Sequence, residues 1–189
     1  MRALSFLTLI LAFLPASQSL AGTIIVGRTD ARECYLATLA ESSPAGDRRG
    51  LDACDRAANA DNGDAYAHAA ILVNRADIRL RMRDYTGTLT DANASIALEP
   101  DLAAAYLNRG AGLIGLQRYQ EALPALEKVI ALNPNDRLEL AYFNRGIARE
   151  HLGDIRGAYH DYKQAQELNP KFEPAKEQLT RFTVTIGSR

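Results

Sequence analysis

The middle of the chain carries the stretch that decides the fold: residues 106–134 read YLNRGAGLIGLQRYQEALPALEKVIALNP. An Ala- and Leu-rich segment is followed by a Gln-Arg turn, then by an amphipathic segment and a proline. A proline cannot continue a helix, so it marks the end of the second segment. The stretch therefore predicts two helices, over 102–116 and 119–132, joined by a tight turn.

The same pattern occurs twice more, aligned on an Asn-Arg pair. The spacing is 34 residues from Asn74 to Asn108 and 36 from Asn108 to Asn144. Each Asn is followed by an apolar residue at 11, a small residue at 14, a leucine at 24 and a proline at 26 positions. These residues are Tyr85, Tyr119 and Ile155; Thr88, Ala122 and Ala158; Leu98, Leu132 and Leu168; and Pro100, Pro134 and Pro170. A repeat of this period indicates stacked helical units, so we expect an all-α array with further helices over 64–83, 85–98, 137–152, 155–168 and 173–182.

The unit over 106–134 resembles the tetratricopeptide repeat family. Gly110 and Ala122 occupy the small-residue places of the family pattern, and Tyr119 and Pro134 occupy its aromatic and proline places. The resemblance implies a right-handed superhelix of antiparallel helical hairpins whose first helices line a concave face. It also implies binding of a protein or peptide, because the family is chiefly non-catalytic.

The first 21 residues are typical of a secretory signal peptide. Arg2 precedes an apolar run from Ala3 to Leu14, and the segment Ser19-Leu20-Ala21 ends in small residues suited to a cleavage site. The apolar run is shorter than the roughly 20 residues that span a bilayer. We predict cleavage between Ala21 and Gly22, which leaves no membrane span; an uncleaved anchor is the alternative.

Composition limits the classes of function. The chain has 189 residues, 47% of them hydrophobic, with 22 Lys and Arg against 23 Asp and Glu, for a formal net charge of -1. The apolar fraction predicts a globular protein rather than a disordered one. The basic residues neither outnumber the acidic ones nor cluster, so we expect no nucleic-acid partner.

The two cysteines fit no CxxC redox or zinc motif. In antiparallel helices the offsets of facing residues keep a constant sum, and the small residues 2 and 14 after each Asn set that sum at 16. If Thr38 and Gly50 are the small pair of a degenerate first unit, the same rule pairs Cys34 with Cys54. We predict a disulfide between them, since exported proteins fold in oxidising compartments. Two buried free thiols are the alternative.

This first unit completes the predicted organisation of the chain. The predicted parts are a signal peptide over 1–21, a degenerate hairpin over 22–64, repeats over 65–101, 102–136 and 137–171, and a capping helix with a tail over 172–189. The last repeat has two extra residues before Leu140. We expect them in its first helix or in the turn that enters it.

The concave face implied by the resemblance is the expected binding surface. Its candidates are first-helix residues that point away from the second helix, and they form a mainly apolar groove with a charged end at each side. The predicted groove residues are Val73, Asn74, Asp77, Leu107, Asn108, Ala111, Ile114, Phe143, Asn144 and Ile147, and the ends carry Arg81 and Glu150. The three Asn amides suit the backbone of an extended peptide. They equally suit the backbone of the neighbouring repeat, and the sequence leaves both readings open.

A second regular set is the arginine after each Asn. Asp91 and Asp161 lie 16 residues after Arg75 and Arg145, near the facing offset, so internal ion pairs are expected there rather than an anion site. Ala125 takes that place in the middle unit. Arg109 is therefore the candidate contact for an anion.

Patterns suggestive of enzymes fit the helical repeats better. The GxGxxG over 110–115 lies inside a helix with no strand before it. The turn over 61–64 lacks the spacing of an EF-hand and is expected to place Asp64 as a helix cap. The three histidines lack metal-ligand spacing. We therefore expect no catalytic residues, cofactor or metal.

The predicted function is a non-catalytic adaptor that binds a protein or extended peptide in its concave groove. The alternatives are an envelope enzyme or small-ligand-binding protein on a helical scaffold, or a structural protein with weak self-association. Repeats with Asn-Arg-Gly and a short two-cysteine leading unit resemble exported bacterial members of the family. We expect the periplasm, with the extracellular medium as the alternative.

Overall fold

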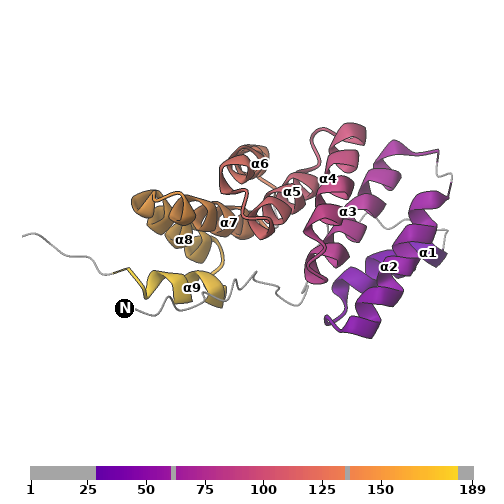
Figure 1. Cartoon of the computed structure of the whole chain (residues 1–189), viewed down its shortest axis with the longest axis horizontal. Helices are drawn as coiled ribbons and strands as arrows, with labels where there is room; N and C mark the ends of the chain where they lie inside the picture. The colour runs from indigo at the N-terminus through magenta and orange to yellow at the C-terminus, as the bar shows by residue number, and fades with distance from the viewer. Residues whose placement is uncertain (1–28, 61–62, 135–136, 183–189) are drawn as a thin grey trace, which may run out of the picture.

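The computed structural model describes residues 29–60, 63–134 and 137–182. The predicted signal peptide lies outside these residues. The described residues form helices α1 to α9 without a strand between them (Figure 1). Their bounds are α1 Thr29–Leu39, α2 Pro44–Asn59, α3 Ala65–Arg81, α4 Tyr85–Leu98, α5 Ala103–Gly115, α6 Tyr119–Leu132, α7 Leu138–His151, α8 Ile155–Leu168 and α9 Glu173–Leu179. The predicted all-α fold is confirmed, and the ends of α3 to α8 lie within two residues of the predicted ends.

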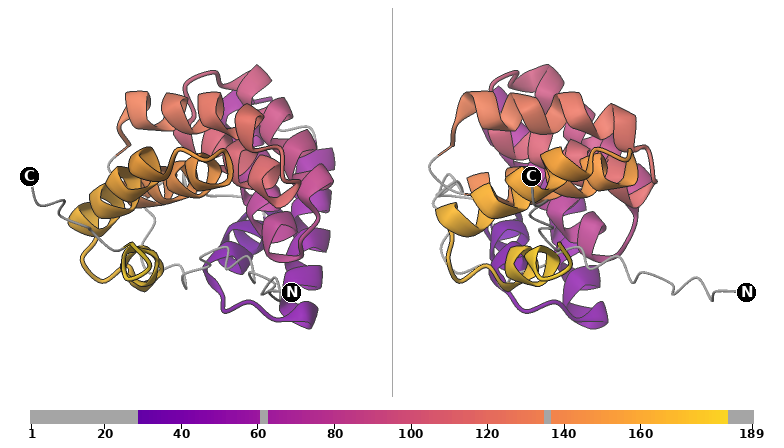
Figure 2. Two further views of the ribbon diagram at one scale, coloured as in Figure 1. Left: turned by 60° about the vertical axis from the view of Figure 1, so that its left-hand side comes forward. Right: turned by 90° about the vertical axis from the view of Figure 1, so that its left-hand side faces the viewer.

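Consecutive helices pair into hairpins, and the hairpins stack along an arch (Figure 1). The first helices of neighbouring hairpins, α1, α3, α5 and α7, contact one another in turn. The second helices, α2, α4, α6 and α8, make no comparable contacts with one another within the described residues. First helices therefore form the inner layer of the arch, and second helices form its outer layer (Figure 2).

Glycine lets the two helices of a hairpin approach closely. A Cβ added at Gly110 would lie 2.6 Å from Leu126 Cδ2, and one added at Gly146 would lie 2.7 Å from Tyr162 Cε1. The constant sum of 16 would place Leu126 opposite Tyr106 and Tyr162 opposite Tyr142. In the structure Leu126 lies against Gly110 and Tyr162 against Gly146, one turn further along the first helix. Side chains lean toward the N-terminus of their own helix, which accounts for the shift.

We expect Gly110→Ala to lower the free energy of unfolding by about 1–3 kcal/mol, because the added methyl overlaps both Cγ and Cδ2 of Leu126. Gly112→Ala is the matched control in the same helix. Its Cβ would lie 3.2 Å from Leu89 Cδ2, which needs only a small adjustment. Urea denaturation of both variants provides the measurement, and equal stability of the two would contradict the packing explanation.

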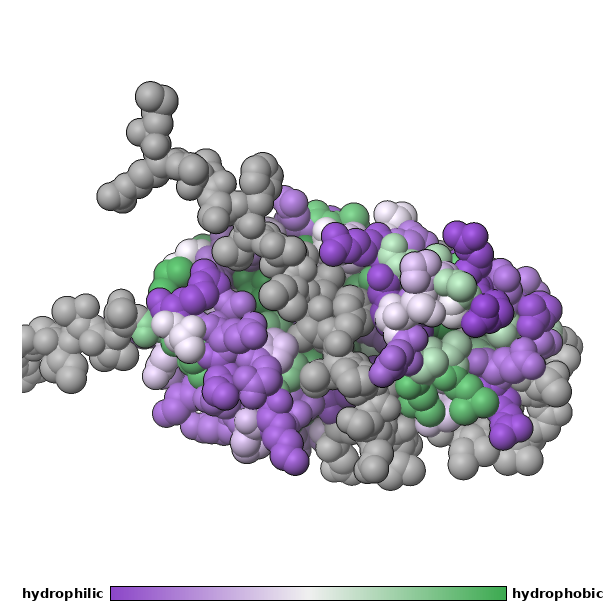
Figure 3. Space-filling model, turned by 90° about the horizontal axis from the view of Figure 1, so that it is seen from below, coloured by the Kyte–Doolittle hydropathy of each residue, from purple (hydrophilic) through white to green (hydrophobic). Residues whose placement is uncertain are grey.

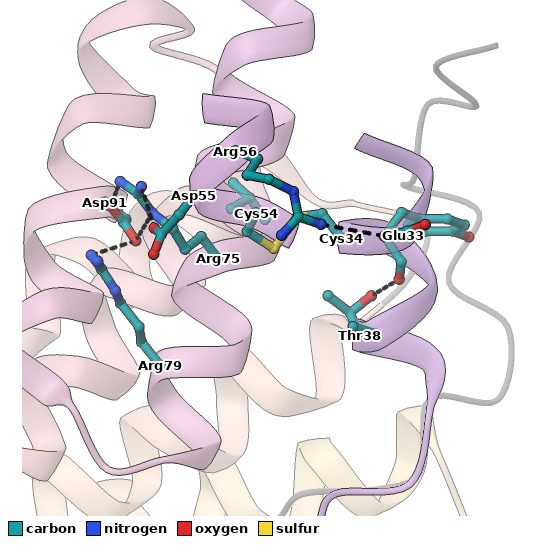
Figure 4. Close-up of a disulfide and its surroundings, with 12 residues drawn as sticks. Glu33, Cys34, Thr38, Cys54, Asp55, Arg56, Arg75, Arg79 and Asp91 are labelled. Atoms are coloured by element: carbon teal, nitrogen blue, oxygen red, sulfur yellow. Dashed lines mark hydrogen bonds and ion pairs between the residues drawn. A yellow bond between two sulfur atoms is a disulfide. The ribbon is translucent and has the colours of Figure 1, made fainter. Parts of the chain in front are cut away.

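The first hairpin joins α1 to α2 through a disulfide between Cys34 and Cys54 (Figure 4). Both cysteines are fully buried. The predicted pairing of the two cysteines is confirmed, but the small pair is displaced by one residue, because a Cβ at Gly50 would meet Ala37 rather than Thr38. The Thr38 hydroxyl instead donates to the Tyr35 carbonyl within α1.

Two apolar clusters form the core. One lies in the first hairpins around the disulfide and includes Ile71 and Ile78. The other extends from α5 to α9, where the Phe143 ring packs edge-on against Phe172 at 5.1 Å and tilted against Tyr162 at 5.5 Å. The final helix therefore covers the end of the array. It ends at Leu179, three residues before the predicted end. Within the described ranges, no helix has both the length and the apolar character to cross a bilayer.

Candidate functional site

The inner layer places the predicted groove residues on one stripe of each first helix. Helical periodicity aligns the residues 4 and 1 before each Asn with the residue 3 after it. Of the ten predicted groove residues, Asn74 and Asp77 are half-buried and the other eight are buried. Most of the predicted apolar groove is therefore packed interior, and Asn74 and Asp77 are its accessible polar members.

The Asn108 side chain holds two hairpins together. Its amide Nδ2 donates to the Val73 carbonyl at 3.1 Å, and the side chain is 2% exposed. A buried amide that is already paired contributes to packing, because breaking the bond would leave the buried N–H of the Asn108 amide unpaired. Of the two readings that the sequence left open, the contact between repeats describes Asn108.

The charged ends predicted for the groove are engaged within the fold. Arg81 Nη2 donates to the Ala37 carbonyl at 2.8 Å and pairs with Asp47 Oδ1 at 2.9 Å, and Nη1 donates to the Ala40 carbonyl at 3.1 Å. These contacts close the C-terminal end of α1, where helix carbonyls lack partners within the helix. Arg81 therefore links α3 to the first hairpin, and its place at a charged end of the groove stays a prediction.

Glu150, at the other end, is hydrogen-bonded to a buried tyrosine of the last hairpin, Tyr162. Its carboxylate accepts a hydrogen bond from the Tyr162 hydroxyl at 2.8 Å and one from Arg181 Nη2 at 2.6 Å. Burial and the hydrogen bond to Glu150 together raise the pKa of Tyr162 well above its usual value. His151 stacks on Tyr119 at 4.1 Å. Glu150 thus joins α7 to α8 and to the residues after α9.

Buried carboxylates pair with the arginines, as the sequence predicts for two of the three repeats. Asp91 accepts hydrogen bonds from Arg75 at 2.6 and 3.0 Å and from Arg79 at 2.8 Å, and its side chain is 1% exposed. Arg75 also reaches back to Asp55 on α2 at 2.9 Å (Figure 4). The hydrogen bond to Asp91 raises the pKa of Arg75. This network links second helices of adjacent hairpins through α3.

The last repeat has the same pairing of two arginines with one buried aspartate within its hairpin, and the middle repeat lacks that aspartate. Asp161 accepts from Arg145 at 2.7 and 2.9 Å and from Arg149 at 2.9 Å. In the middle repeat Ala125 offers no carboxylate to Arg109, which is half-buried. Arg118 holds the pKa of Glu121 below its usual value through a hydrogen bond, and Arg109 adds a smaller attraction. The anion contact at Arg109 stays a prediction.

An ion pair that the sequence did not predict connects two hairpins that are not neighbours. Arg137, which precedes α7, donates from Nη1 to Asp77 Oδ2 on α3 at 3.2 Å. The helix α5 lies between α3 and α7, since it contacts both. The pair therefore bridges the inner layer over a sequence separation of 60 residues.

Comparison with known proteins identifies the repeats. The family model described as "Tetratricopeptide repeat" matches residues 103–136 and 140–172. These two segments are tetratricopeptide repeats. The hairpins of this tetratricopeptide repeat protein that precede residue 103 lie outside the match; the repeat over 65–101 has Ala76 and Thr88 where the next has Gly110 and Ala122.

The relatives of this tetratricopeptide repeat protein are much longer proteins. "Protein SGT1 homolog" of Oryza sativa subsp. japonica is 41% identical over 61 residues, which are 32% of this chain and 17% of the relative. "Hsp70-Hsp90 organizing protein" of Triticum aestivum is 32% identical over 120 residues, which are 64% of this chain and 19% of the relative. The chain thus spans less than a fifth of either relative.

Solved structures share the tetratricopeptide repeat fold. "MamA RS-1 ArsTM double mutant" has a TM-score of 0.61 at 22% identity, covering 80% of this chain and 82% of the other. "Arabidopsis OM64 TPR domain" has a TM-score of 0.58 at 23% identity, covering 62% of this chain and 95% of the other. At these identities the likeness is one of fold.

Proposed function

We propose that the chain is an exported, non-catalytic adaptor that holds a protein or an extended peptide segment against the inner layer formed by α3, α5 and α7. The observation that carries this proposal is the layered arrangement, in which first helices contact one another and leave a shared inner face. A relative similar over 120 residues bears the name Hsp70-Hsp90 organizing protein, which describes a protein that organises two others. That likeness supports a scaffolding role.

The surface favours recognition through individual polar contacts. Figure 3 shows the arch from below, where hydrophilic residues dominate the described surface and apolar residues gather in smaller patches. On the inner stripe the half-buried positions are Ala70, Asn74, Asp77 and Ala104, which are small or polar, and Leu140, which is the one large apolar residue among them. We therefore propose that bound segments are selected by shape and hydrogen bonding rather than by a broad apolar surface.

Export is supported by two features of different kinds. The first 21 residues have the order of a signal peptide, with Arg2, an apolar run and small residues before the predicted cut. The disulfide between Cys34 and Cys54 is buried, and disulfides persist in oxidising compartments. We propose the periplasm as the site of action.

We expect Ala104→Gln to reduce capture of the partner at least tenfold. Ala104 is half-buried on the inner stripe, so a longer side chain there obstructs the face without leaving a cavity. The matched control is Ala94→Gln, which adds the same side chain at an exposed position of α4 in the outer layer. The measurement is crosslinking in the periplasm followed by affinity purification and mass spectrometry. Equal capture by both folded variants would contradict an inner binding face, and absence of the protein from the periplasmic fraction would contradict the proposed periplasmic location.

A further inference from the structure

The contact between Asp77 and Arg137 combines three features. Asp77 is the accessible acidic residue among the predicted groove positions, with its side chain 18% exposed. The matching positions in the next two repeats hold Ala111 and Ile147, so the charge occurs once along the stripe. Arg137 reaches this carboxylate from the far side of α5 and is itself 27% exposed.

The contact between Asp77 and Arg137 is longer and more accessible than the buried ion pairs of the repeats. The distance is 3.2 Å through one nitrogen, whereas Arg75 reaches Asp91 through two nitrogens at 2.6 and 3.0 Å. Both side chains keep some access to water, at 27% exposure for Arg137 and 18% for Asp77, so another charged group can approach the contact. Arg137 also adopts a left-handed backbone with φ of 62°, which is unfavourable for a residue with a Cβ.

We propose that Asp77 is a docking point for a basic side chain of the bound segment, and that Arg137 occupies this point in the free protein as an internal competitor. The internal contact shows which chemistry the position accepts, since a guanidinium already lies at hydrogen-bond distance from the carboxylate. The partner is then an extended peptide with an Arg or Lys. This inference rests on the proposed inner binding face.

The surroundings of Asp77 favour a single basic residue within an otherwise uncharged segment. The stripe of α5 beside it offers Leu107 and Ala111, which are apolar and buried. Arg81, one turn further along α3 from Asp77, is held by Asp47 and by two carbonyls. An incoming cation therefore meets one carboxylate beside uncharged residues of α5, and it has to displace Arg137 to bind.

The test separates the competitor from the docking carboxylate. The probes are two immobilised pools of 11-residue peptides, randomised except for a central Arg in one pool and a central citrulline in the other, which keeps the shape and removes the charge. We expect Arg137→Gln to strengthen binding of the Arg pool three- to tenfold and to leave the citrulline pool unchanged. We expect Asp77→Asn to reduce the Arg pool to the level of the citrulline pool, and the double variant to behave as Asp77→Asn.

Other outcomes overturn the inference. If the contact between Asp77 and Arg137 only stabilises the stacking of the hairpins, both single variants change the binding of both pools by the same factor. The preference for the Arg pool over the citrulline pool is then unchanged. Absence of binding by either pool also counts against Asp77 as a docking point, while the Ala104→Gln capture experiment still decides the proposed function separately.

A charge exchange keeps the test decisive if a single variant folds poorly. The variant Asp77→Arg/Arg137→Asp rebuilds the ion pair with reversed polarity. We expect it to prefer a third pool with a central Glu by at least threefold over the Arg pool, with a far-UV circular dichroism spectrum like that of the wild type. An unchanged preference for Arg in this folded variant would exclude Asp77 as the contact.

Discussion

Asp91→Ala is expected to lower the free energy of unfolding by about 3–5 kcal/mol, the range for removing one partner of a buried ion pair. The Asp91 carboxylate is 1% exposed and accepts three hydrogen bonds, two from Arg75 and one from Arg79. Those arginine side chains are 16% and 20% exposed, so they cannot turn fully to water when the carboxylate is removed. Two poorly solvated cations would then lie side by side.

Asp101→Ala is the matched control for this prediction. Asp101 also pairs with a cation, Lys128, at 3.0 Å, but its side chain is 82% exposed. Exposed pairs contribute about 0.2–1 kcal/mol, so this variant should stay near the wild type. Urea denaturation followed by far-UV circular dichroism measures both. Equal losses in the two variants would show that burial of the carboxylate does not control the effect.

The repeat register was predictable because the same constraint recurs in each unit. Small residues must lie where two helices approach, and a proline must follow the second helix, so Gly110, Gly146 and the closing prolines mark the units without any structural information. The same register located the pairing of Arg75 with Asp91 and of Arg145 with Asp161. These are short-range features within a hairpin.

A further internal signal could have extended the predicted network. Arg79 and Arg149 lie five residues after their Asn, where the middle repeat has Leu113, and each joins the buried aspartate of its own repeat. The middle repeat thus loses this arginine and the aspartate together. Joint loss indicates that the two residues interact, because an arginine without its buried partner would carry a desolvation cost.

Contacts between distant units could not be read from the sequence. The pair of Asp77 with Arg137 depends on how far the arch curves over three hairpins, and that curvature accumulates from small rotations at each interface. The same holds for Arg81, whose role at the end of α1 depends on the angle between the first two hairpins. The role of Asn108 depended on burial, which the repeat pattern does not specify.

Replacing both cysteines, Cys34→Ala/Cys54→Ala, is expected to lower the free energy of unfolding by about 3 kcal/mol, the chain-entropy value for a closed loop of this size. We expect the first hairpin to depend strongly on this link, because among the described helices α1 contacts only α2 and α3. Without the link, α1 is expected to open before the rest of the chain. Its amide hydrogens should then exchange faster than those of α5.

Reduction of the wild-type protein supplies the control. Urea denaturation with dithiothreitol should bring the wild type down to the stability of the double variant and leave the variant unchanged, because the variant has no bond to reduce. Hydrogen exchange measured by mass spectrometry should show faster exchange in α1 in both samples, with α5 to α8 nearly unaffected. Retention of wild-type stability and α1 protection in the double variant would mean that packing alone holds the first hairpin. The contacts from Arg81 to the Ala37 and Ala40 carbonyls would then act together with the apolar packing of α1 against α3.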